Sequence, residues 1–223
     1  MQKVTSILNT ASQQQRDDLA KLLPAEKFKK GVPASTDKLI EAIRWAHDST
    51  FIGVVFKDPK SYLEILKTVA EHLEIKISAG ENSEIEIEKL ICQKVGQQIL
   101  KKMNPEERAK FIAAVEKESI KHRDGSGFIG AGGVAAALVA GNMGGFGTYM
   151  LATTGLAAIS GALGITLPFA AYAGLSTALG VALGPVGWVG LGLAALFTMG
   201  GPCYDKLIPS ILYITMLRNQ PKQ

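Results

Sequence analysis

Residues 125–150 read GSGFIGAGGVAAALVAGNMGGFGTYM, and they begin a run without charged residues or histidine that ends only at Asp205. The run covers residues 125–204, and 20 of its 80 residues are glycine. Charged residues make up about a quarter of an average chain, so such a run is unusual for a protein surface. We therefore expect these residues to be buried, in a membrane or beneath protein, and to form the working part of the molecule.

Prolines at positions 168, 185 and 202 and the Gly144-Gly145 pair divide this run. They predict apolar helices at about 126–142, 146–164, 169–184 and 185–199. Small residues recur at four-residue intervals along these helices and leave a smooth face on which a second helix can pack closely. The predicted helix-packing and membrane residues are Gly133, Ala137, Gly141, Gly145, Gly180, Gly184 and Trp188, the last as an interfacial aromatic.

The length of the run suits a membrane. A spanning helix needs about 20 residues, so the run supplies two hairpins whose flanks lie on the same side. Lys121 and Arg123 before it, and Lys206 and Arg218 after it, suit a cytoplasmic side. Glycine is a poor helix former in water, costing about 1 kcal/mol relative to alanine. Three alternatives stay open: permanent membrane residence, a sheathed form that inserts, and a soluble core that never inserts.

Residues 1–124 differ, because they carry 21 positive and 19 negative charges. Caps and apolar spacing predict amphipathic helices there. These are Val4–Leu23, one capped by Ser35 or Thr36 and ending near His47, one from Asp58-Pro59 to Leu73, one from the Ser83–Glu86 capping box to Met103, and one from Asn104-Pro105 onward.

The predicted fold is all-α, with two regions. Residues 1–124 form a charged, amphipathic helical bundle, and residues 125–223 form glycine-rich apolar helices packed as hairpins, followed by an amphipathic helix from Leu207 to Arg218. Lysines and acids are interleaved in the first region, so the sequence predicts no nucleic-acid partner. The first 30 residues are polar and lack an apolar signal segment, which favours a cytoplasmic protein. Together with the uncharged run, this predicts a protein associated with or inserted in the inner membrane.

No pattern in the chain indicates catalysis, so we expect no enzyme, no cofactor and no metal. The histidines lie in separate segments without a partner at metal-ligand spacing; they are His47, His72 and His122. Cys92 and Cys203 form no spacing motif and are expected to be free thiols. Four acids resemble a carboxylate cluster, but we expect them to line a solvated helix start, where the dipole favours negative charge. They are Glu81, Glu84, Glu86 and Glu88.

Three blocks resemble the YaaW family of bacterial proteins. They are Tyr62-Leu-Glu-Ile-Leu-Lys-Thr-Val-Ala-Glu-His-Leu, the segment 84–115 with Lys101-Lys102-Met103 and Phe111, and a tail with Gly184-Pro185-Val186-Gly187, Tyr204, Ile208-Pro209 and Leu217-Arg218. The similarity covers most of residues 60–220 in order and spacing. It implies a bacterial, cytoplasmic setting and supplies no catalytic residues.

Two functions compete on this pattern. The first is a membrane-active protein similar in logic to helical pore-formers, in which charged helices keep apolar hairpins soluble until they insert into or pair within a lipid bilayer. The second is a chaperone-like assembly factor or homo-oligomeric scaffold, which uses the apolar helices to pack against a membrane-protein partner or another copy of the chain.

Overall fold

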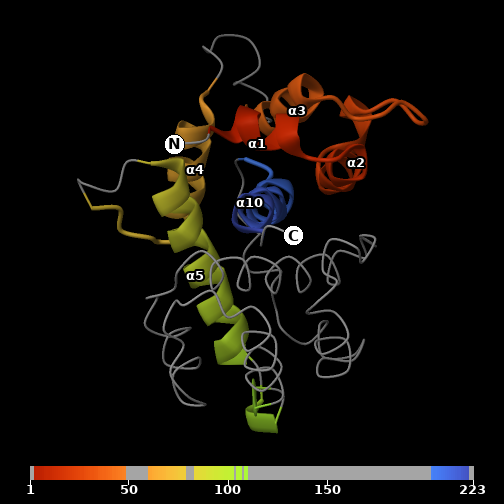
Figure 1. Ribbon diagram of the computed structural model, residues 1–223. Coiled ribbons are helices and arrows are strands. Elements are labelled where there is room, and N and C mark those ends of the chain that lie inside the picture. The colour runs from red at the N-terminus through yellow and green to blue at the C-terminus, as the bar shows by residue number, and fades with distance from the viewer. Residues whose placement is uncertain are drawn as a thin grey trace.

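The computed structural model describes residues 3–48, 60–78, 83–102, 104–106, 108–109 and 202–220 (Figure 1). Every regular element in these residues is helical, which confirms the all-α class for this part of the chain. The elements are α1 (Val4–Thr10), α2 (Gln13–Leu22), the 3₁₀ helix η1 (Ala25–Lys27), α3 (Thr36–Asp48), α4 (Tyr62–His72), α5 (Glu84–Lys102) and α10 (Tyr204–Asn219). The four apolar helices expected between residues 126 and 199 lie outside the described residues.

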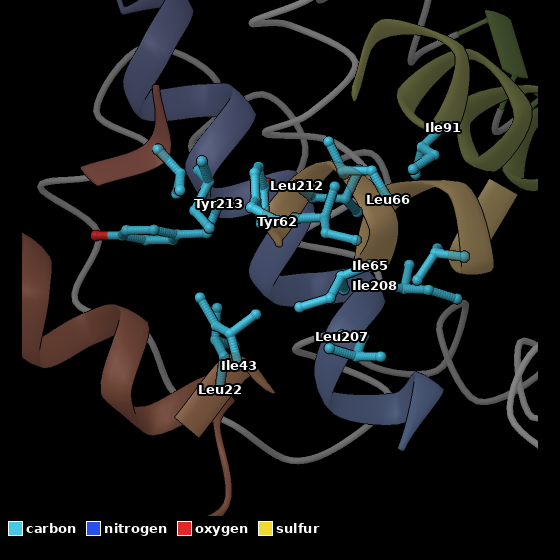
Figure 2. Packing of buried hydrophobic residues seen from close by; sticks show 14 of the residues in the cluster. Leu22, Ile43, Tyr62, Ile65, Leu66, Ile91, Leu207, Ile208, Leu212 and Tyr213 are labelled. Carbon is cyan, nitrogen blue, oxygen red and sulfur yellow. The ribbon is translucent and has the colours of Figure 1, made fainter. Parts of the chain in front are cut away.

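Helix α10, the last helix in sequence, lies at the centre of the bundle. In Figure 1 it is the blue helix seen nearly end-on, and it packs against α1, α2, α3, α4 and α5. Figure 2 shows the resulting core, in which Leu207, Ile208 and Leu212 of α10 meet side chains from the surrounding helices. The chain therefore returns after residue 201 to complete the core that its first 102 residues begin.

The expectation of an amphipathic helix from Leu207 to Arg218 was wrong. All ten residues from Leu207 to Met216 are buried, including Ser210 and Thr215. A helix that is covered all round needs no polar face. The two buried hydroxyls are satisfied locally, since Ser210 donates to the Lys206 carbonyl at 2.7 Å and Thr215 to the Ile211 carbonyl at 2.8 Å. The described residues do not test the predicted boundary at residue 124.

The single helix expected from Val4 to Leu23 is two helices. Ser12 has an extended backbone and begins α2 through a capping box, in which its side chain accepts from the Gln15 N–H and the Gln15 side chain accepts from the Ser12 N–H. The guanidinium of Arg16 then donates to the Ala11 carbonyl at 2.6 Å and to the Ala34 carbonyl at 3.3 Å. These bonds cap the end of α1 and tie the loop before α3 to α2.

Two of the predicted caps are confirmed. The Ser35 side chain accepts from the Lys38 N–H at 3.3 Å at the start of α3. At the start of α5, Glu86 donates its N–H to Ser83 Oγ at 3.3 Å, and its carboxylate accepts from the Ser83 N–H at 3.1 Å. Each cap satisfies N–H groups that the first turn of a helix leaves without a partner.

The start predicted for α4 at Asp58-Pro59 was wrong. Ser61 is extended and caps α4 through a box with Glu64, so the helix begins at Tyr62. Its other end is a Schellman turn, because the Ile75 N–H donates to the Ala70 carbonyl at 2.8 Å. Glu74 takes the left-handed position of that turn with φ 55°, where glycine is the usual residue.

Helical spacing predicts one inner stripe on α5, made of Ile87, Leu90, Ile91, Val95, Ile99 and Met103. The observed inner face differs from it in part. Ile87, Ile91 and Val95 are buried as expected, whereas Leu90 is only partly buried. The positions that share the face are instead Glu88 and Cys92, each one residue after a buried aliphatic side chain. The Glu88 carboxylate therefore points into the core, and the candidate site is built around it.

Candidate functional site

A buried ion pair joins the end of α10 to the start of α5. Arg218 donates from Nε to Glu88 Oε2 at 2.9 Å and from Nη2 to Glu88 Oε1 at 3.0 Å. This two-pronged geometry is the strong arrangement for an arginine and a carboxylate. The side chains of Arg218 and Glu88 are only 5% and 1% exposed, so the pair lies out of water.

Glu84 extends this pair to a third helix. Its Oε2 atom accepts from Arg218 Nη2 at 3.0 Å and from the Val4 backbone N–H at 2.9 Å. Val4 is the first residue of α1, whose initial N–H groups have no partner within the helix. The cluster of Arg218, Glu84 and Glu88 therefore fixes the starts of α1 and α5 against the last turn of α10.

The cluster holds two carboxylates and one cation. Burial raises the pKa of Glu88 above its usual value, and the neighbouring Glu84 adds to this, although the hydrogen bonds from Arg218 act in the opposite direction. Burial tends to lower the pKa of Arg218, but the bonds to Glu88 outweigh it and the net pKa is raised. Arg218 is therefore charged throughout the accessible pH range.

Tyr62 connects the cluster to a pocket. Burial raises the pKa of its phenol well above the usual value, and the charge of Glu88 raises it further. The Tyr62 hydroxyl is buried and makes no hydrogen bond of ordinary geometry, so its proximity to Glu88 is electrostatic.

The pocket beside Tyr62 has a volume of about 550 Å³ and lies between the starts of α1, α4 and α5 and the face of α3. That size is within the range of small-molecule sites. Its lining is mainly aliphatic, with Ile40, Leu63 and Ile85 among its walls. Lys3 and Arg44 contribute positive charge to it and Glu84 negative charge, so the lining does not select one sign of ligand.

The sequence-based expectation for the four acids was wrong in part. Glu86 does cap the exposed start of α5, but Glu84 and Glu88 turn inward and pair with Arg218, while Glu81 lies outside the described residues. One signal in the sequence could have revealed this: Glu84, Glu88 and Cys92 recur every four residues, and so share one face of the helix. The remaining clue is Arg218, which follows an uncharged run from Leu207 to Leu217.

The predicted helix-packing residues cannot be placed, because they all lie outside the described residues. They are Gly133, Ala137, Gly141, Gly145, Gly180, Gly184 and Trp188. Within the part of the chain that the structure describes, no helix is long and apolar enough to cross a membrane. The same residues hold no group of three metal-ligating side chains.

Among the described residues, His47, His72 and Cys203 lie apart from this cluster, and His122 lies outside the described residues. His47 contacts Asp48 through Nδ1 at 2.7 Å and Thr68 through Nε2 at 3.1 Å. His72 stacks on Tyr204 with ring centroids 3.6 Å apart and planes within 5°. Cys92 is buried and Cys203 is partly buried, and the two do not form a disulfide with each other.

Comparison with protein-family models, curated proteins and solved structures finds no match to this chain. The resemblance to the YaaW family therefore has no support beyond the three sequence blocks and stays a prediction.

Proposed function

We propose that this protein is a membrane-active helical protein, in which a charged bundle carries a glycine-rich apolar segment that inserts into a lipid bilayer as hairpins. The observation that carries the proposal is the contact between α5, which precedes the segment, and α10, which follows it. Residues 103–201 thus leave and rejoin one folded body. A segment of this kind suits insertion as hairpins, because its two ends are attached to the same folded body and so stay on the same side of the membrane.

Composition supports the same conclusion. The segment carries no charge between Gly125 and Tyr204, whereas all 24 Lys and Arg and all 20 Asp and Glu of the chain lie outside that run. The four-residue spacing of small residues such as Gly133, Ala137 and Gly141 suits close helix pairing in lipid, where backbone approach replaces the hydrophobic effect as the driving force. The proposed partner is the bilayer itself, at the cytoplasmic face of an inner membrane.

The test is flotation with sealed liposomes, combined with release of an encapsulated dye. The full-length protein is mixed with neutral and with anionic vesicles at several pH values, and it should float with the lipid and release dye. Protein that stays at the bottom of the gradient and releases no dye under every condition would refute the proposal. If that protein formed a stable homo-oligomer without detergent, the assembly-factor function would be favoured instead.

Two substitutions at one position sharpen the test. Ala137→Lys places a charge in a predicted membrane helix, at a cost of about 2.5–3.5 kcal/mol near the centre of a span, and should reduce flotation and dye release. Ala137→Leu is the matched control, because it keeps the helix apolar but obstructs the small-residue face. It should float normally and release less dye if pairing along that face forms the pore.

A further inference from the structure

We propose that the bundle stays closed while the glycine-rich segment inserts, so that α5 and α10 remain clamped together and the segment crosses the membrane an even number of times. This inference rests on the proposed function and adds that the bundle itself keeps its structure during insertion. The alternative is an opening bundle, in which the charged helices separate from α10 to expose the segment.

The clamp between α5 and α10 is the first observation in favour of a closed frame. Arg218 of α10 holds Glu88 of α5 through two hydrogen bonds at 2.9 and 3.0 Å. Its third bond reaches Glu84, which also holds the first N–H group of α1. Moving α10 away would break the contacts of three helices at once, and these contacts cooperate because they share the same guanidinium.

The burial of α10 is the second observation. Ten consecutive residues of this helix, from Leu207 to Met216, are buried, and five other helices contact it. A charged helix lying on one side of a core can detach and leave the remainder folded. Removing the helix at the centre exposes the apolar faces of all its neighbours to water, so opening at this place amounts to unfolding the bundle.

The start of α10 is anchored as well as its end. The Cys203 N–H donates to the Ala46 carbonyl at 2.7 Å, which ties the residue before α10 to the last turns of α3. Tyr204 stacks on His72 at the end of α4. Both ends of α10 are therefore anchored in the bundle, which acts as a fixed frame.

A disulfide across the clamp tests whether the frame must open. Thr215 of α10 lies beside the Cys92 thiol of α5. A protein with Thr215→Cys and Cys203→Ser therefore has one cysteine on each side of the contact. Cross-linking is measured by loss of free thiols, and unchanged circular dichroism before oxidation establishes that the variant folds. The Cys203→Ser protein alone, oxidised in parallel, is the matched control.

The inference expects oxidised and reduced forms of the cross-linked protein to float and to release dye equally. Flotation or release that appears only after reduction would overturn it, because the frame would then have to open. Failure of the reduced form and of the control to float would refute the membrane function itself, and the inference with it.

A labelling experiment checks the topology without a cross-link. Single cysteines are placed at Val32 or at Gln220, both exposed, in a protein with Cys92→Ser and Cys203→Ser. After the protein is added to sealed vesicles and floated, both positions should react with a membrane-impermeant maleimide. Protection of one position and labelling of the other would place the two flanks on opposite sides, which an even number of crossings forbids.

Discussion

Replacing Arg218 by methionine should destabilise the bundle by about 3 kcal/mol at pH 7, because it leaves Glu88 buried without its cation. Glu88 is 1% exposed and loses two hydrogen bonds. Glu84 suffers less, since its side chain is 19% exposed and keeps the bond from the Val4 N–H. Removing one partner of a buried pair typically costs about 3–5 kcal/mol, so the expected loss lies near the lower limit.

Protonation of Glu88 sets an upper limit on the cost of its buried charge. A carboxyl with an ordinary pKa of 4.5 can be protonated at pH 7 at a cost of about 1.36 kcal/mol for each of 2.5 pH units, or about 3.4 kcal/mol. The variant can take this route, so the cost of the buried Glu88 charge does not exceed about that figure. Replacement by methionine keeps the apolar contacts of the arginine stem, which limits any additional loss.

The same route sets the sign of the pH dependence. Without Arg218, the folded-state pKa of Glu88 rises further above its unfolded value. A group with a raised folded-state pKa contributes stability that is present below the unfolded pKa and lost as pH rises through the folded pKa. The deficit of the variant should therefore shrink between pH 7 and pH 5, by at most about 1.4 kcal/mol per unit.

Urea unfolding followed by circular dichroism, at several values from pH 5 to pH 8, measures this deficit. Lys206→Met is the matched control, because Lys206 and Asp205 form a pair on the same helix at 3.3 Å with 32% and 37% exposure. Such surface pairs contribute about 0–1 kcal/mol. The double variant with Arg218→Met and Glu88→Met should recover most of the lost stability, since apolar side chains then replace both charges.

Two results would refute this account of the cluster. One is a loss for Arg218→Met that is no larger than the loss for Lys206→Met. The other is a double variant whose loss equals or exceeds the sum of the single losses, because the two residues would then act independently.

Four further predictions concern the helices around the cluster. Ser61→Ala removes the cap of α4 and should cost about 1 kcal/mol in urea unfolding, whereas an unchanged midpoint would contradict the capping role. Glu74→Gly should raise the melting temperature, because relief of the left-handed backbone is worth up to about 1–2 kcal/mol before the entropy of the unfolded glycine is subtracted, and a lowered melting temperature would contradict it. Burial raises the pKa of the Cys92 thiol, so a thiol reagent at pH 8 should modify Cys203 in the folded protein and Cys92 only in urea; faster reaction of Cys92 would contradict this. Leu212→Ala should cost about 2–5 kcal/mol in the same unfolding assay, and a loss below that range would mean that α10 is less tightly packed than its burial indicates.

Several helix starts of this fold are determined by short segments of the sequence. The Ser83–Glu86 box and the Ser35 cap could be predicted because each interaction joins residues three positions apart. The break between α1 and α2 was missed although Ser12 and Gln15 form the same kind of box. Apolar residues continue on both sides of Ser12, so periodicity alone favoured an uninterrupted helix.

The candidate site could be predicted only in part. Three acids of one helix were recognised as a group, but their outward and inward directions were not, because a helix start rich in glutamate is usually solvated. Arg218 was assigned to a membrane flank on charge alone. Its partner Glu88 lies 130 residues earlier in the chain, and no local pattern indicates such a pairing.

The sequence by itself determined where α3 and α5 begin, because the caps at Ser35 and Ser83 join residues within one turn. It also determined that residues 125–204 carry no charge, which is the ground for the membrane proposal. Only the tertiary structure decided that α10 is the centre of the bundle and that Arg218 is buried against Glu84 and Glu88. The physical reason is that the number of neighbours covering an apolar helix depends on the whole chain. The sequence of the helix alone does not indicate whether it lies at the edge or at the centre of a bundle.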